Sequence, residues 1–153
     1  MMPEKSLTQP ELLYTRKHRS KLLVSLMAAV LGVVGAHWWY LGRRFAWLPT
    51  LFSVSMLIWA QTFDSWWDNP AFLMLVFPML DGFIEALVFA LKPDEWFDRR
   101  YNPGSGQQTR TGWGPVLVAI LTTFLGGTVF VFWIAMAVMY VYTAMGWLDG
   151  LVI

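Results

Sequence analysis

The chain has 153 residues, of which 57% are hydrophobic and only 14% are charged. Because soluble domains average about 25% charged residues, this composition excludes an ordinary water-soluble surface and predicts a protein embedded in lipid. The net charge of +1 gives no argument for nucleic-acid binding, and the absence of cysteine excludes disulfides and thiolate metal sites. We expect an all-α fold, a polytopic membrane helical bundle of three to four embedded helices plus a short interfacial helix.

Residues 1–21 form a polar, basic N-terminal arm. Its cations gather just before the first apolar run, at Arg16, Lys17, Arg19 and Lys21. Two interpretations stay open: a positive-inside anchor, or a site for anionic lipid. Since no small-residue cleavage site follows convincingly, we expect the first apolar run to remain in the membrane rather than to be a signal peptide.

The first apolar segment covers residues 22–41, about 20 residues, or roughly 30 Å as a helix, which is just enough to span the hydrocarbon core. It leads into the junction, residues 32–44, with three glycines, one histidine, three consecutive aromatics and two arginines. Glycine permits close approach or a sharp turn, and tryptophan and tyrosine prefer the membrane interface. We therefore expect the junction to be an interfacial turn between two embedded helices.

This junction resembles the TM-two domain family, membrane proteins named for two transmembrane helices joined by a short polar-aromatic linker. The residues that fit the family pattern are Gly32, Gly35, Ala36, His37, Trp39, Tyr40, Leu41 and Gly42. Trp38 stands where the family usually has arginine, and Asp81 resembles the acid of the family's second helix. The resemblance covers about Lys21 to Leu91, within a two-transmembrane-type domain at 22–91. It implies membrane embedding but no settled biochemical activity.

Two further apolar segments follow, at residues 45–63 and 71–91, separated by a loop at 64–70 that ends in an Asn-Pro turn signal. Both segments are long enough to span the membrane. Pro78 in the later segment is expected to kink its helix about one turn earlier.

Asp81 and Glu85 are spaced i and i+4, so they lie on one face of that helix. Because an acid at mid-membrane costs about 2.5–3.5 kcal/mol on the insertion scale, both need partners. We expect a polar intramembrane cluster of these acids with His37, Arg43 and Arg44. An internal clamp between helices, a transport or proton path, and snorkelling of Glu85 toward the interface all stay open.

Residues 92–114 form a polar connector with a short interfacial helix that starts after Pro93, and Trp96 and Phe97 are expected to dip into the headgroups. Residues 115–153 contain a long uncharged transmembrane helix and a short tail. Gly126 and Gly127 within that helix are expected to permit close helix packing.

The eleven lysines and arginines lie only in the arm, the junction and the connector. We expect a protein of the cell (inner) membrane, and this bias predicts that the arm and the connector lie in the cytoplasm. That arrangement requires either the first or the second apolar segment to be re-entrant. The family precedent of two full spans is the alternative, and the side of the C-terminus stays open.

The sequence has no nucleophile with a base, no phosphate loop and no metal-ligand spacing for its two histidines. We therefore expect no enzyme activity, no metal site and no cofactor. The favoured function is a structural or interaction protein of the bilayer, with a membrane-protein partner or a second copy of itself. The alternative is a channel, carrier or lipid-binding protein that uses His37, Asp81 and Glu85.

Overall fold

The computed structural model describes residues 18–149, so Arg16, Lys17 and the end of the tail lie outside the described residues. Within that range every regular element is helical, which confirms the all-α prediction. The elements are α2 (Lys21–Leu31), η1 (Gly32–Val34), α3 (Ala36–Leu41), α4 (Trp47–Ala60), α5 (Pro70–Leu73), α6 (Val76–Leu91), α7 (Asp94–Tyr101), α8 (Trp113–Leu121), η2 (Thr122–Gly126) and α9 (Gly127–Ala144).

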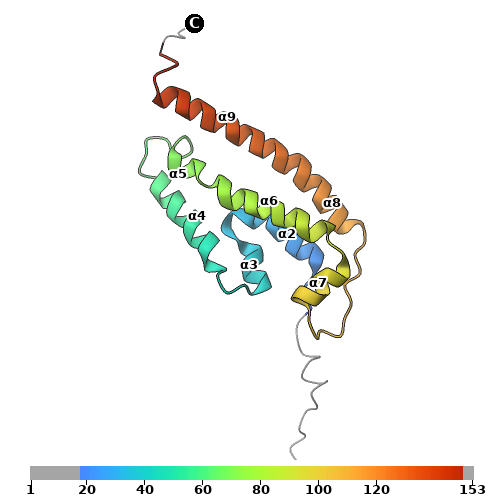
Figure 1. Ribbon diagram of the computed structural model, residues 1–153. Coiled ribbons are helices and arrows are strands. Elements are labelled where there is room, and N and C mark those ends of the chain that lie inside the picture. Colours follow the sequence, from blue (N-terminus) through green and yellow to red (C-terminus); the bar gives the residue numbers. More distant parts are fainter. Residues whose placement is uncertain (1–17, 150–153) are drawn as a thin grey trace, which may run out of the picture.

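The first apolar segment folds back on itself (Figure 1). Helix α2 gives way to one turn of 3₁₀ helix, η1, and the chain reverses at Gly35, whose φ of 70° suits glycine and strains other residues. Helix α3 then returns, so that the backbone amide of Ser20 donates to the hydroxyl of Tyr40 over 3.1 Å. The expectation that residues 22–41 form a single helix long enough to span is wrong, because the chain turns inside the segment; the re-entrant alternative for this segment stays open. We call residues 21–41 the helical hairpin.

The turn of the helical hairpin packs directly on the backbone of α6. A Cβ atom placed on Gly32 would lie 2.5 Å from the Cα of Gly82, and one placed on Gly82 would lie 2.8 Å from the carbonyl oxygen of Ala28. Neither glycine can therefore carry a side chain without moving the two helices apart. Gly32 thus marks a close approach, as its sequence context predicts.

Two elements are long and apolar enough to cross a membrane, Pro70–Leu91 and Trp113–Ala144. The first comprises α5 and α6, and its break at Met74 and Leu75 lies about one turn before Pro78, as predicted. The second comprises α8, the π-helical turn η2 and α9, and it runs along α6 in Figure 1. The helices Lys21–Val34 and Trp47–Ala60 are also apolar but shorter.

The two predicted packing glycines of the last helix differ in their surroundings. A Cβ on Gly126 would lie 3.1 Å from the ring of Phe83 on α6, whereas one on Gly127 would meet nothing within 4 Å. Gly126 therefore supports close packing and Gly127 does not.

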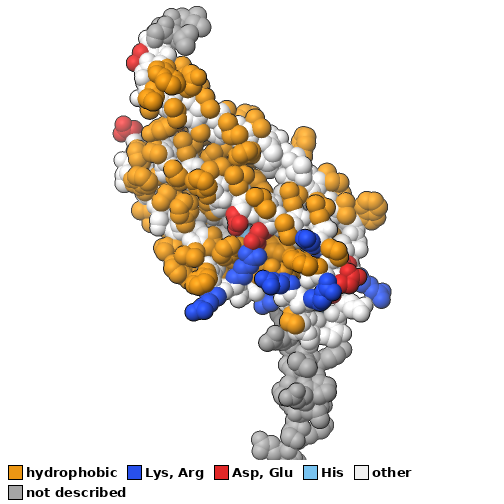
Figure 2. Space-filling model, viewed as in Figure 1, with side chains coloured by type: hydrophobic (Ala, Val, Ile, Leu, Met, Phe, Trp, Pro, Cys, Tyr) orange, Lys and Arg blue, Asp and Glu red, His pale blue; other side chains and the backbone are white. Residues whose placement is uncertain are grey.

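The lysines and arginines gather at one end of the molecule, beneath a largely hydrophobic body, whereas a few acids lie at the other end (Figure 2). Helix α7 lies at this end, and its Asp94 and Glu95 in the first turn agree with the predicted helix start. Phe97 on α7 is fully buried against Phe89, with ring centroids 6.3 Å apart. The expectation that Phe97 dips into the headgroups is therefore wrong: the short helix turns this ring into the core.

Candidate functional site

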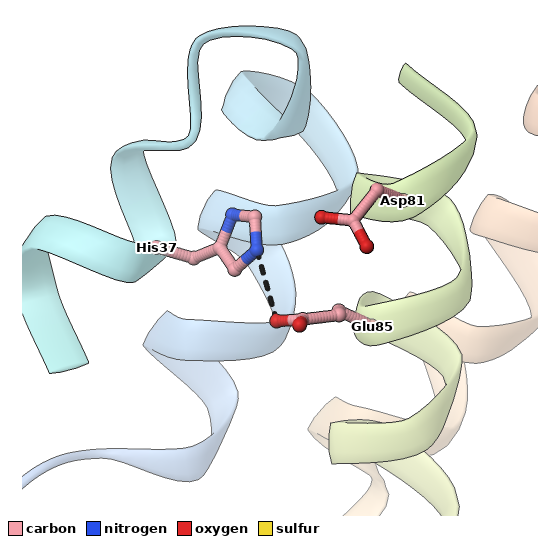
Figure 3. Close-up of side chains that lie close together, drawn as sticks. All are labelled: His37, Asp81 and Glu85. Carbon is pink, nitrogen blue, oxygen red and sulfur yellow. Dashed lines mark ion pairs between the residues drawn. The ribbon is translucent and has the colours of Figure 1, made fainter. Parts of the chain in front are cut away.

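The candidate site lies where α3 faces α6. The turn at Gly35 directs α3 back along α2, which places His37 in its first turn with no exposed surface. Asp81 and Glu85 lie one helical turn apart on α6, and Figure 3 shows both carboxylates turned toward the imidazole of His37. The structure therefore brings these three side chains close together, as expected from the sequence.

Glu85 lies between two basic side chains. Its Oε2 atom is 3.0 Å from Nε2 of His37, and its Oε1 atom accepts from Nη1 of Arg43 over 2.5 Å. Arg43 also donates to the hydroxyl of Tyr101 over 3.4 Å and lies over the ring of Trp38, 4.8 Å from its centroid. These contacts join α3, the residues after it, α6 and α7.

Asp81 occupies the outer edge of the cluster. One of its carboxylate oxygens lies within 4.8 Å of the ligating atoms of His37 and Glu85, and no ion pair involving Asp81 forms among residues 18–149. It also lines an apolar pocket of about 450 Å³ between α4 and α6. The other lining residues are Trp38, Leu48, Pro49, Phe52, Phe77 and Pro78.

Several buried polar atoms of the site lack hydrogen bonds of good geometry within the described part of the chain. They are Nδ1 and Nε2 of His37, Oε2 of Glu85 and Nε1 of Trp38. The contact between His37 and Glu85 is therefore an ion-pair contact by distance rather than a well-aligned hydrogen bond. Leaving a buried polar group unsatisfied costs about 1–3 kcal/mol.

Arg44 was predicted in the cluster, and the structure places it elsewhere. Gly42, with φ of 66°, ends α3, and the two following arginines diverge. Arg43 turns toward Glu85, whereas Arg44 is exposed and lies 5.5 Å from the centroid of the Phe45 ring. Sequence reasoning also missed Tyr101, which no local pattern connects to the junction.

A second polar network fastens the connector to the start of α2. Lys21 is only 4% exposed, and its Nζ atom lies 2.9 Å from Asp94 and 2.6 Å from the carbonyl oxygen of Lys92. The backbone amide of Thr111 donates to the other oxygen of Asp94 over 2.6 Å. Lys21 is therefore buried and paired within the protein.

Asp98 continues this network on the next turn of α7. Burial alone would raise its pKa, but hydrogen bonds from Thr109 and Asn102 outweigh burial and lower the pKa below its usual value. Asn102 in turn accepts from the backbone amide of Arg19 over 2.8 Å. Hydrogen bonds thus hold the connector against the start of the helical hairpin, and we call this network the cap.

Comparisons of the chain with family models, with curated proteins and with solved structures found no match. The all-helical fold and its two apolar helices therefore define the class: a helical protein with helices suited to crossing a membrane.

Proposed function

We propose that the protein is a small integral membrane protein with a structural or interaction role, in which the polar cluster locks the helical hairpin to α6. The observation that carries this proposal is the double engagement of Glu85 by His37 and Arg43. Both basic residues come from the hairpin and the junction, and the acid comes from α6. Within lipid such groups are costly unless they satisfy one another, so the same contacts that shelter the charges hold the helices together.

The positions of the cations support a specific topology. The ends of the helical hairpin lie together, because Ser20 contacts Tyr40, and Arg19 contacts the connector through Tyr101 and Asn102. Residues 18–20 at the end of the arm, the junction and the connector therefore share one end, so the bias of lysine and arginine is satisfied if that end is cytoplasmic. We infer three crossings, by α5–α6, by α8–α9 and by α4 together with its flanking turns in residues 45–63, because the 14 residues of α4 alone span only about 21 Å. The first apolar segment is then re-entrant and covered by α6.

The proposed membrane is the cell (inner) membrane, and the partners are the bilayer and either another membrane protein or a second copy. Helix α9 supports a role in contacts, because none of its side chains is buried within the described chain. Membership of the TM-two domain family stays a prediction. An anionic-lipid site at the arm also stays a prediction: Lys21 is buried, Arg19 donates to the carbonyl oxygen of Tyr101, and Arg16 and Lys17 lie outside the described residues.

The proposal is tested by Glu85→Gln, which keeps the shape of the side chain and removes its charge. We expect the variant to lose about 2 kcal/mol of stability, since hydrogen bonds to charged groups contribute about 1.5–3 kcal/mol. The measurement is unfolding of the detergent-solubilised protein in sodium dodecyl sulfate, followed by tryptophan fluorescence. Glu95→Gln, at an exposed acid of α7, is the matched control, and equal stability of the two variants would refute the clamp.

A second candidate function, a carrier or lipid-binding protein, is favoured by one observation. Asp81 lines an apolar pocket and forms no ion pair within the described residues. Flux and lipid-binding assays in liposomes test this candidate with Asp81→Asn. Activity in the parent protein that is lost in a folded variant would support it, and an inactive parent would argue against it.

A further inference from the structure

The side chains of His37, Asp81 and Glu85 each offer one ligating atom, and these atoms lie within 4.8 Å of one another. They come from two elements, α3 and α6, and converge on one point between them (Figure 3). We propose that they form a binding site for a divalent first-row transition-metal ion of the kind represented by Mn²⁺ and Zn²⁺.

The burial of His37 is an independent observation that points to a ligand. Its side chain has no exposed surface, and its Nδ1 atom has no hydrogen-bond partner in the described part of the protein. Its Nε2 atom contacts Oε2 of Glu85 at 3.0 Å, but without the alignment of a good hydrogen bond. Because buried polar atoms are nearly always well satisfied in folded proteins, this poorly aligned contact indicates that both atoms can turn toward a shared ion.

An ion would require the ligating atoms to move closer together. Ligating atoms that each lie about 2.1 Å from one ion are about 3.4 Å apart in a tetrahedral site and about 4.2 Å apart when they lie on opposite sides of the ion. The atoms here lie within 4.8 Å of one another, so a pair at that limit has to close by about 0.6–1.4 Å. Asp81 is only partly buried and lines the adjacent pocket, which leaves its carboxylate room to rotate toward the ion and leaves space for water as a further ligand.

The donor set and the local charge select the class of ion. One imidazole nitrogen with two carboxylate oxygens favours ions from Mn²⁺ to Zn²⁺, whereas Mg²⁺ and Ca²⁺ prefer oxygen ligands alone. Arg43 holds Oε1 of Glu85, which leaves Oε2 as a single ligating oxygen. Arg43 also balances one carboxylate, so the site keeps one net negative charge to attract the ion. This proposal replaces the sequence-based expectation of no metal site, which considered only the spacing of the two histidines.

Metal binding goes beyond the proposed structural role, and an ion held by His37 and Glu85 would replace their direct contact with a link through the ion. The clamp is tested by the stability of the metal-free protein, whereas the metal site is tested by ion binding. A failure of one therefore leaves the other standing.

The experiment uses the full chain, purified in detergent and stripped with a chelator. Binding of Mn²⁺ is measured by the paramagnetic resonance of the free ion, and binding of Zn²⁺ by calorimetry. We expect one ion per chain, and a higher unfolding temperature when Zn²⁺ is added. His37→Gln and Asp81→Asn should each weaken binding by at least about tenfold, since even changes outside the ligand set cost 10–100-fold, and both should abolish the Zn²⁺-dependent rise.

The matched controls are His18→Gln and Asp64→Asn. His18 contacts Ser105 and Thr109 in the connector, and Asp64 is an exposed loop acid. Both variants should bind the ions as the parent does. Absence of binding at millimolar Mn²⁺ or Zn²⁺ would overturn the proposal, as would unchanged affinity in folded Asp81→Asn. Tight Mg²⁺ binding that is indifferent to His37→Gln would also overturn it. If His37→Gln does not fold, the nearly isosteric Asp81→Asn decides the matter.

Discussion

The contact between Gly32 and Gly82 makes a sharp prediction about a single methyl group. In Gly82→Ala the new Cβ would lie 2.5 Å from the Cα of Gly32 and 2.8 Å from the carbonyl oxygen of Ala28. Carbon atoms pack best at about 3.5–4.0 Å, so the helical hairpin and α6 must separate by about 1 Å. Overpacking of this kind costs about 1–3 kcal/mol, and the separation would also pull His37 away from Glu85.

Gly127→Ala is the matched control, because its Cβ would meet nothing within 4 Å. Alanine is favoured over glycine inside a helix by about 0.8–1.0 kcal/mol, so this control should be neutral or stabilising. Unfolding in sodium dodecyl sulfate, followed by tryptophan fluorescence, measures both variants. The reasoning would be refuted if Gly82→Ala were as stable as Gly127→Ala, since the two changes add the same atom to the interior of a helix.

Three further variants test other parts of the structure. Gly35→Ala places a side chain at φ of 70° and against the ring of Pro49, so we expect a loss of at least about 1 kcal/mol, measured by the same unfolding titration. Lys21→Met keeps the packing but removes the partner of Asp94, and because that acid stays partly exposed we expect a loss of only about 1 kcal/mol; a change within error would contradict the described cap. Asp98 has a lowered pKa in the folded protein, so its ionised form stabilises the fold above the pKa of the unfolded state, about 3.9. That contribution is lost as the pH falls through the folded pKa, and Asp98→Asn should therefore be less stable than the parent at pH 7 but approach it in acid; a difference independent of pH would count against this.

Several features could be predicted from the sequence because the alternative would carry a large free-energy cost at the residues concerned. The break before Pro78 follows from the missing amide, and the start of α7 follows from Pro93 and the two acids after it. The meeting of His37, Arg43, Asp81 and Glu85 follows from the expense of charge in lipid. These inferences require only that each costly group is paired or placed at a helix end, and they do not require knowledge of the tertiary fold.

Other features depend on contacts that no local pattern encodes. Glycine at position 35 permits a reversal without requiring one, so the fold-back of the first apolar segment stayed only one of several alternatives. Lys21 meets Asp94 from a distant part of the sequence, and its place next to an apolar run favours the simpler prediction of an interfacial anchor. Helix α7 has only eight residues, too few for periodicity to show that Phe97 faces inward.

The central claim is that the first apolar segment returns to the side from which it entered and is held there against α6. Because the chain has no cysteine, single cysteines introduced as Ser6→Cys, Arg44→Cys, Ser65→Cys and Gln108→Cys report the topology directly when a membrane-impermeant maleimide is applied to oriented vesicles. We predict that residues 6, 44 and 108 react from the same side and residue 65 from the opposite side. Labelling of residue 44 from the side opposite to residue 6 would contradict the account, because the first segment would then cross the membrane.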